Sequence, residues 1–554
     1  MDRLDDLACG PTRCSGQHRG IPPRTRGTLS AVNHPAIANF GALSSYWSKV
    51  RPKALALAGD GVRLDWADAE SRCNALAAAL RGLGVRPGDR VGLLLTNCVE
   101  WPLLLMAILR LGALIVTLNP RLGARELQQI EHDAECLLMI WKPELCLALK
   151  SVFSAGNLAD DTLMISPRGT GAPTPYARAS AACPYVEPAL VTPQSYFGIC
   201  YTSGTTGLPK GVTLTHGSVQ AQMLSLIFAL RLTSEDRGLV IAPLAYAGPL
   251  LLNLCPHLML GGATFIERQS DPEYLLQLID RERLTTIGCT PVLWQRMADS
   301  ALFERVDISC LRVAFTGGAP VPAGLSHRFA HRGVCIRQAY GLSEFNGFVT
   351  LPSDEMAVQR PEVAGVPVLG AMLRIVDAGG LDCGIDEVGE IWIRGPQLMD
   401  GYWRNEAANA AAMQDGWFKT GDLGKRDPQG QLIVLERKKN LIISGGVNIY
   451  PAEIERALAT LPEIAEVAVF GVQDAEWGER AIAVVHPRVP LVASELRARA
   501  KQLLGPLKCP REFLISPAPL PRTNLEKISR QSLPQLYEQL TGRQISAIKA
   551  SVAD

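Results

Sequence analysis

The stretch that decides the fold is residues 201–216, which read Tyr-Thr-Ser-Gly-Thr-Thr-Gly-Leu-Pro-Lys-Gly-Val-Thr-Leu-Thr-His. It follows an apolar run, residues 195–200, that predicts a β-strand. Its glycines let the backbone curl with N–H groups pointing inward, its hydroxyls add short donors, and Lys210 adds a positive charge. Such a loop suits a triphosphate. It is not the Walker P-loop, Gly-x-x-x-x-Gly-Lys-Ser/Thr, because Lys210 follows Pro209 and precedes Gly211.

The composition is that of an ordinary globular enzyme. The 554 residues suffice for several domains, and 47% hydrophobic with 20% charged residues is typical. A net charge of +1 argues against electrostatic binding of nucleic acid, which needs a strongly basic surface. The 14 cysteines are spread singly, without a Cys-x-x-Cys pair. This spacing predicts free thiols and argues against a disulfide scaffold or a zinc site. Free thiols are typical of a reducing compartment, so we expect the protein in the cytoplasm.

Two segments bear on membrane insertion and targeting. Residues 101–118 are apolar but contain Arg110, and they are predicted to form a buried helix (102–111) and a strand (113–118), not a membrane span. Residues 1–38 are rich in arginine, glycine and proline and lack an apolar core typical of a signal peptide. We expect them to form an extension with little fixed structure.

Alternating strands and helices from about residue 47 predict an α/β fold. Residues 54–64 favour a hairpin turning at Asp60-Gly61, and Asp65 is a plausible N-cap for a helix over 67–83 that ends at Gly84. Parallel strands, at whose carboxyl ends open α/β sheets bind ligands, are predicted at 91–95, 311–315 and 334–339. After a break at 436–440, a compact α+β pattern predicts elements at 451–461, 466–470, 481–486 and 493–504.

The run at 201–216 closely resembles the signature loop of the ANL superfamily, which comprises acyl-CoA synthetases, adenylation domains of peptide synthetases, and luciferases. Its members use ATP to activate a carboxylate as an acyl-adenylate and pass the acyl group to a thiol. The resemblance extends from about residue 47 to residue 533, and indicates an AMP-forming acyl-CoA synthetase using ATP, Mg²⁺ and CoA. It implies an AMP-binding α/β domain with mixed and parallel sheets (39–436), a hinge (437–439) and a small mobile α+β domain (440–554).

The resemblance assigns nucleotide contacts to several segments. The β- and γ-phosphates are expected on Thr202, Ser203, Gly204, Thr205, Thr206, Gly207 and Lys210. The adenine is expected on Gly318, Ala319 and Pro320, with Gln338 beside it. Residues 340–344 resemble the Tyr-Gly-x-Thr-Glu motif and contribute Tyr340, Gly341 and Ser343, the serine standing where relatives usually have threonine. The ribose hydroxyls are expected on Asp422, which can accept from both, with Arg437 as its companion; Lys439 at the hinge and Lys527 complete the set.

Three of these residues are expected to act in catalysis. Adenylate formation brings two anions together, so the enzyme must cancel charge and align them. Glu344, with Thr202, is expected to hold Mg²⁺. Lys210 neutralises phosphate charge, and Lys527 is expected to bridge the carboxylate and the α-phosphate. In isolation, each of these charged residues would more often be a solvated surface group.

The other two substrates are assigned by position. CoA is expected to pass along the glycine-rich segment at Ser444, Gly445 and Gly446, where a bare backbone permits close approach. The acyl pocket is expected to be walled by Tyr246, Trp294, Gly317, Tyr340 and Phe345. Because no lysine or arginine stands at these positions, a dicarboxylate is disfavoured, and medium-chain, alicyclic and aromatic monocarboxylates stay open.

Three departures from the family pattern leave alternatives open. Glu436 stands where relatives commonly have glycine, Asn440 where they have aspartate, and Glu526 where glycine precedes the catalytic lysine. Glu526 is expected either to stiffen the loop or to place a carboxylate beside Lys527 and so raise the pKa of this lysine. The alternatives are an adenylating enzyme that loads a carrier protein, a nucleotide-binding pseudoenzyme, and a luciferase-type oxidation. A homodimer also stays open, and neither a nucleic acid nor a transmembrane segment is expected.

Overall fold

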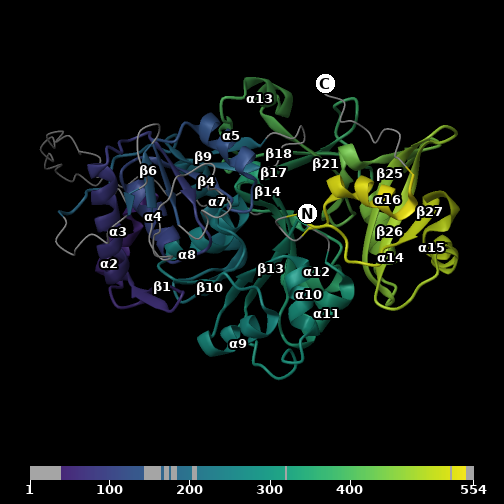
Figure 1. Ribbon diagram of the computed structural model, residues 1–554, viewed down its shortest axis with the longest axis horizontal. Helices are drawn as coiled ribbons and strands as arrows, with labels where there is room; N and C mark the ends of the chain where they lie inside the picture. The colour runs from purple at the N-terminus through teal and green to yellow at the C-terminus, as the bar shows by residue number, and fades with distance from the viewer. Residues whose placement is uncertain are drawn as a thin grey trace, which may run out of the picture. The chain divides into compact units, whose positions relative to one another are not determined.

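The computed structural model describes residues 39–142, 164–167, 174–175, 184–202, 209–318, 321–523 and 527–543. Within these ranges the strands form four sheets, two of them large, and helices cover their faces (Figure 1). The predicted α/β class is confirmed. The extension predicted at residues 1–38 lies outside the described residues.

The eight-stranded sheet carries the predicted strand that precedes the signature loop. Its order is β19 (Gly401–Tyr402), β9 (Lys210–Thr215), β8 (Tyr196–Thr202), β4 (Leu114–Leu118), β3 (Arg90–Leu94), β5 (Leu138–Trp141), β6 (Met164–Pro167), β7 (Thr174–Pro175). The pairings of β3 with β4 and β5, and of β4 with β8, are parallel, whereas β8 and β9 form an antiparallel hairpin. The signature loop therefore closes a hairpin at the end of a buried strand.

The nine-stranded sheet carries the other two predicted motif strands. Its order is β16 (Val366–Pro367), β15 (Gly347–Leu351), β14 (Ile336–Leu342), β13 (Val313–Gly317), β12 (Thr286–Gly288), β10 (Arg237–Val240), β11 (Ala263–Ile266), β1 (Leu55–Gly59), β2 (Val62–Asp65). The pairings of β12 with β13 and of β13 with β14 are parallel, as predicted. Both motif strands begin two residues later than predicted, so their carboxyl ends reach Gly317 and Leu342.

Helices pack between and around these sheets (Figure 1). Their bounds are η1 (Phe40–Ala42), α2 (Leu43–Val50), α3 (Trp66–Gly82), α4 (Glu100–Arg110), α5 (Ala124–Ala134), α7 (His216–Leu230), η3 (Pro249–Leu254), α8 (Cys255–Leu260), α9 (Pro272–Glu282), α10 (Pro291–Asp299), α11 (Ala323–His331), η4 (Ser343–Phe345), α12 (Asp354–Gln359), α13 (Glu406–Ala412). Local signals placed them well. Asp65 caps α3 by accepting from the N–H of Asp68 at 2.8 Å, and Asp60 and Gly61 both have the positive φ of a primed turn.

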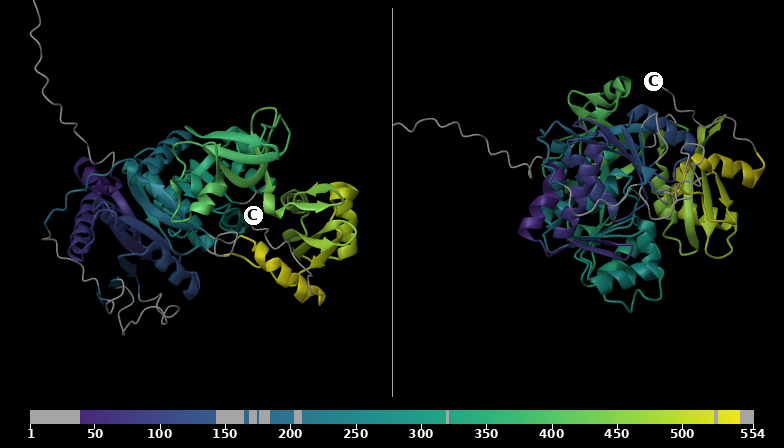
Figure 2. Two further views of the ribbon diagram at one scale, coloured as in Figure 1. Left: turned by 90° about the horizontal axis from the view of Figure 1, so that it is seen from above. Right: turned by 60° about the vertical axis from the view of Figure 1, so that its left-hand side comes forward.

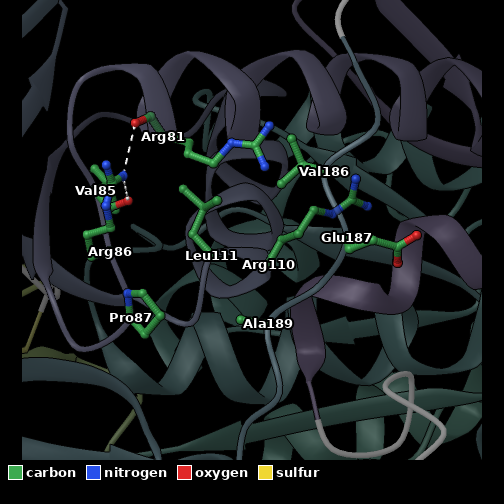
Figure 3. Close-up of a pocket in the computed structure, with 9 residues that line it drawn as sticks. All are labelled: Arg81, Val85, Arg86, Pro87, Arg110, Leu111, Val186, Glu187 and Ala189. Carbon is green, nitrogen blue, oxygen red and sulfur yellow. Dashed lines mark hydrogen bonds between the residues drawn. The ribbon is translucent and has the colours of Figure 1, made fainter.

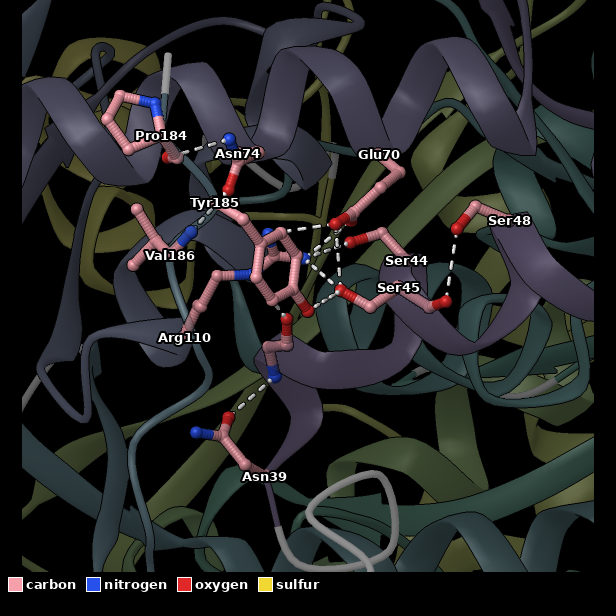
Figure 4. A network of polar contacts seen from close by, with 11 residues as sticks. Asn39, Ser44, Ser45, Ser48, Glu70, Asn74, Arg110, Pro184, Tyr185 and Val186 are labelled. Atoms are coloured by element: carbon pink, nitrogen blue, oxygen red, sulfur yellow. Dashed lines mark hydrogen bonds and ion pairs between the residues drawn. The ribbon is translucent and has the colours of Figure 1, made fainter.

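Helix α4 is buried from residue 101 to residue 110, as predicted for this apolar stretch. The fully buried Arg110 donates to both oxygens of Glu70, and to the hydroxyls of Ser44 and Ser45 (Figure 4). This ion pair lets a guanidinium remain charged inside the core. Among the described residues, no helix has both the length and the apolar character needed to cross a bilayer.

Two five-stranded sheets follow. The first contains β17 (Met372–Val376), β18 (Gly389–Arg394), β21 (Trp417–Arg426), β20 (Met413–Gln414) and β22 (Leu432–Arg437). After η5 (Lys438–Asn440), the second contains β24 (Val447–Ile449), β23 (Ile442–Ser444), β26 (Gly478–Pro487), β25 (Ile464–Asp474) and β27 (Glu512–Ile515).

The last sheet has helices on both faces. They are α14 (Pro451–Leu458), α15 (Ala493–Lys508), η6 (Arg530–Ser532) and α16 (Leu533–Thr541). Along β26, Ala481, Ala483 and Val485 pack with α14 and α15, whereas Val484 packs with Leu533 of α16. This alternation buries both faces of the strand, which runs between the helices in Figure 2. The predicted α+β character of this region is confirmed.

Candidate active site

The hairpin of β8 and β9 brings the two ends of the signature loop together. Thr202 and Lys210 are paired in register, and the Thr202 hydroxyl donates to the Lys210 carbonyl at 3.4 Å. The predicted phosphate contacts at Ser203, Gly204, Thr205, Thr206 and Gly207 lie outside the described residues. The described strands therefore fix where the loop begins and ends.

Lys210 and Glu344 are joined through Tyr402, a residue that the sequence analysis did not single out. The Lys210 ammonium lies 5.1 Å from the centre of the Tyr402 ring, and the Tyr402 hydroxyl donates to Glu344 Oε1 at 2.9 Å. Burial and the charge of Glu344 raise the pKa of Tyr402, so this hydroxyl stays protonated and remains a donor. The only sequence signal for Tyr402 is its place in the run Gly401-Tyr402-Trp403, beside the glycine that begins β19.

Tyr340 and Asp422 are buried, and the exposed Arg437 reaches Asp422 from the surface. The Tyr340 hydroxyl donates to Asp422 Oδ2 at 2.8 Å, and Arg437 Nε lies 3.2 Å from Asp422 Oδ1. The Asp422 side chain is 10% exposed, and burial raises its pKa, while Arg437 and the Tyr340 hydroxyl oppose that rise. The structure thus brings together the carboxylate and the arginine that the sequence paired.

Lys527 lies over Gly318. A Cβ built on Gly318 would be 2.2 Å from Lys527 Nζ, and Gly318 has a φ of +79°. Burial and the nearby Arg437 lower the pKa of Lys527, and Asp422 opposes them. The expectation of a raised pKa was therefore wrong in direction, because burial of the ammonium dominates. Glu526, on which that expectation rested, and the predicted adenine contacts Ala319 and Pro320 lie outside the described residues.

Three further predicted nucleotide residues lie on β14 or directly after it. Gln338 Oε1 accepts from the N–H of Val321 at 2.7 Å, which ties the segment after β13 to β14. Ser343 begins η4, and Gly341 pairs with Phe348 on β15. A Cβ on Gly341 would lie 2.1 Å from the carbonyl oxygen of Gly347, so only glycine fits there.

The predicted acyl-pocket residues separate into two groups. Tyr246 is half-buried, its hydroxyl accepting from Asn119 Nδ2 at 2.6 Å, and a Cβ on Gly317 would meet only a carbonyl oxygen at 3.5 Å. Trp294 and Phe345 have no exposed surface, Trp294 packing edge-on against Phe329. In this structure they belong to the core, so their role as pocket walls stays a prediction.

The charge near Tyr246 also bears on the acid. Arg121 lowers the pKa of Tyr246 against the larger, raising effect of burial, so a cation lies within electrostatic reach of this hydroxyl. The predicted acyl-pocket residues include no lysine or arginine, but Arg121 is close to one of them, Tyr246. This neighbour weakens the argument that the pocket disfavours a second carboxylate.

The predicted CoA segment is a tight turn between β23 and β24. Gly445 and Gly446 have φ values of +57° and +78°, which favour glycine. The Gly445 N–H donates to the carbonyl of Trp477 at 2.8 Å, and a Cβ on Gly445 would lie 2.6 Å from the Trp477 ring. A Cβ on Gly446 would have no heavy atom of the described residues within 4 Å. Ser444, which ends β23, is buried.

Comparison with known proteins identifies the family of this chain. The AMP-binding enzyme family matches residues 45–403, and the AMP-binding enzyme C-terminal domain matches residues 453–527. The chain belongs to the AMP-binding enzyme family. It is thereby placed in the ANL superfamily of AMP-forming acyl-CoA synthetases, as the motifs predicted.

Similar relatives and structures cover nearly the whole chain. A feruloyl-CoA synthase from Amycolatopsis sp is 34% identical over 483 residues, which cover 87% of this chain and 95% of the relative. An indoleacetate–CoA ligase from Aromatoleum aromaticum is 36% identical, covering 86% of this chain and 94% of the relative. The structure of o-succinylbenzoate coenzyme A synthetase from Bacillus subtilis, in complex with ATP and magnesium ion, has a TM-score of 0.76 and 28% identity, covering 89% of this chain and 98% of that one.

One cavity of this ANL enzyme lies apart from the nucleotide motifs. It has a volume of about 280 Å³ and is lined by Arg81, Val85, Arg86, Pro87, Arg110, Leu111, Val186, Glu187 and Ala189 (Figure 3). Arg86 donates to the carbonyls of Arg81 and Val85, and Arg110 is paired with Glu70. Two of its three guanidinium groups are therefore already engaged, and we assign this cavity no role in the reaction.

Proposed function

We propose that this ANL enzyme converts a monocarboxylic acid to its acyl-adenylate with ATP and Mg²⁺, and then transfers the acyl group to CoA. The observation that carries the adenylation step is the position of Lys527, whose ammonium lies against Gly318 and is electrostatically coupled to Asp422 and Arg437. A cation at this point can stabilise the charge that develops as the carboxylate attacks the α-phosphorus.

Each anionic part of the substrates has a partner in the proposal. Lys210, with the loop that follows Thr202, receives the β- and γ-phosphates. Asp422 accepts from the ribose hydroxyls, and burial against Tyr340 keeps its carboxylate in one orientation. The carboxylic acid enters beside Tyr246 and Gly317.

The residues at the phosphate end fit a magnesium ion. Glu344 uses Oε1 to accept from Tyr402, and Oε2 accepts no hydrogen bond from the described residues. One carboxylate oxygen, completed by phosphate oxygens and water, is a donor set that Mg²⁺ commonly takes, and the bound ion would neutralise phosphate charge. Tyr402 would hold that carboxylate in place.

The thiolation step is proposed to use the Gly445–Gly446 turn. This step requires the part of the chain after the hinge to rotate about Lys439, so that the turn replaces Lys527 beside the adenylate. Lys439 is exposed, so changing its dihedral angles breaks no core packing. The ten described cysteines are free thiols, which is compatible with the proposed action in the cytoplasm.

The proposal is tested by measuring pyrophosphate release and thioester formation over a panel of aromatic, alicyclic and medium-chain acids. We expect release that depends on the acid, and a thioester that forms only with CoA. The Lys527→Ala variant should lose pyrophosphate release while still passing a supplied acyl-adenylate to CoA. Thioester formation on a holo-carrier protein but not on CoA would favour the carrier-loading alternative, and no release with any acid would contradict the proposal.

A further inference from the structure

Glu436 is a buried carboxylate immediately before the proposed hinge. Its side chain is 6% exposed. It accepts four hydrogen bonds, from Arg437 N at 2.9 Å, Asn440 Nδ2 at 2.9 Å, Ala452 N at 3.1 Å and Arg530 Nη2 at 3.3 Å. Three of these four donors come after the hinge.

The bond to Ala452 caps a helix. Ala452 is in the first turn of α14, whose N-cap residue Tyr450 supplies no side-chain hydrogen bond. The N–H groups of a first helical turn need outside acceptors, and a negative charge there is favoured by the helix dipole. Glu436, near the end of β22 and before the hinge, provides both the acceptor and the negative charge.

Arg530 has two carboxylate partners, one on each side of the hinge. Glu455 Oε2 lies 3.0 Å from Arg530 Nη2, and Arg530 Nη1 donates to the carbonyl of Val469 at 2.6 Å. Glu455 also accepts from the N–H of Val469 at 2.8 Å. Glu455 and Val469, which both come after the hinge, therefore suffice to hold Arg530 in place. The bond from Arg530 to Glu436 is an additional one that crosses the hinge.

We infer that Glu436 is a positioning residue: with Asn440 and Arg530 it forms a latch that holds the two sides of the hinge in the orientation where Lys527 lies over Gly318. This inference rests on the proposed function, in which that orientation forms the adenylate. Rotation about residues 437–439 moves Arg530 and Ala452 but not Glu436. The latch must therefore open before CoA can react.

The size of the effect follows from the contacts. Hydrogen bonds to a charged, buried partner contribute enough free energy for roughly a tenfold population change each. Removing the carboxylate at position 436 should therefore shift the hinge away from the adenylate-forming orientation by at least about tenfold.

The test compares Glu436→Ala with Glu455→Gln, which weakens a partner of Arg530 without touching a bond that crosses the hinge. Trypsin cleavage at residues 437–439 of the full chain measures hinge opening without turnover, normalised to a synthetic peptide with the same substitution. Pyrophosphate release and CoA attack on a supplied acyl-adenylate measure the two half-reactions. Glu436→Ala should raise the ratio of the CoA-attack rate to the pyrophosphate-release rate about tenfold, and from a mostly closed wild type it should be cleaved about tenfold faster.

Glu455→Gln should leave the ratio of the two half-reactions unchanged. Glu436→Gln keeps one acceptor oxygen and should be intermediate in both readouts. The inference is overturned if Glu436→Ala slows both half-reactions equally, or if its normalised cleavage equals that of the wild type. If the wild type releases no pyrophosphate with any acid, the proposed function fails, whereas the cleavage comparison still decides the latch.

Discussion

The ammonium group of Lys527 occupies the space that a side chain on Gly318 would need, since a Cβ there would be 2.2 Å from Nζ. The glycine is required twice, because its φ of +79° also disfavours any residue with a Cβ. Gly318, directly after β13, and Lys527, near the end of the chain, are thus complementary in shape.

The variant Gly318→Ala should displace Lys527 and slow pyrophosphate release about 100-fold, since a shift of about 1 Å can cost that much. Backbone strain alone would cost about 1–2 kcal/mol of stability. The matched control is Gly430→Ala, because Gly430 has a φ of +77° and open space at its Cβ. It should lose similar stability and keep its rate. Equal rates in the two variants would contradict the fitted pair.

The variant Asp422→Asn should bind ATP about tenfold more weakly, because it loses a charged acceptor for the ribose hydroxyls. Although its ATP affinity falls, the free energy of unfolding of this variant should not fall. Burial raises the pKa of Asp422 above its usual value, so the native state favours the protonated form, and that stability is lost as pH rises through the pKa. The variant should therefore melt at an equal or higher temperature than the wild type at pH 8.

Thermal melts from pH 8 down to pH 4, with ATP binding by calorimetry, check this prediction. The stability advantage of Asp422→Asn should shrink as acid protonates Asp422 in the wild type. A variant destabilised by the same amount at every pH would show that burial of this charge is not the cause.

The variant Tyr402→Phe should raise the Mg²⁺ concentration needed for half-maximal pyrophosphate release by about tenfold, because Glu344 loses the donor that orients it. The ring that faces Lys210 is kept. The control is Trp403→Phe, which removes an indole donor to the Asp133 carbonyl next to this site. An unchanged Mg²⁺ dependence in Tyr402→Phe would remove the orienting role.

The variant Gly446→Trp should block thioester formation and leave pyrophosphate release nearly intact, because its bulk would fill the proposed path of CoA. Gly446→Ala is the matched control, since it has the same strained φ without the bulk. Both half-reactions should survive in the control. If Gly446→Trp forms thioester at the wild-type rate, the turn does not line the path.

The sequence predicted those features that local chemistry determines. Asp60-Gly61 and Asp65 placed a turn and a helix start, and both follow from the conformations that these residue types favour. The pairing of Asp422 with Arg437 was also predicted, because a family motif carried each residue. These bonds join adjacent strands, β21 and β22.

The sequence could not predict contacts that depend on how distant elements pack. Tyr402 reaches Lys210 and Glu344 because β19 pairs with β9, and nothing near Tyr402 in the chain indicates that pairing. The direction of the Lys527 pKa shift was missed for the same reason, since burial of the ammonium by distant parts of the chain lowers this pKa. Trp294 and Phe345 turn into the core, which their motif positions do not reveal.

The five-stranded sheet that contains β21 and β22 limits where the chain can be truncated. A fragment ending at Trp403 would retain the hairpin of β8 and β9, Tyr402 and Glu344, yet it would lack β21 and β22 and with them Asp422 and Arg437. Under the proposed function, such a truncation product would keep the residues assigned to the phosphates and lose the two assigned to the ribose. Expression boundaries should therefore be drawn beyond β22, which ends at Arg437.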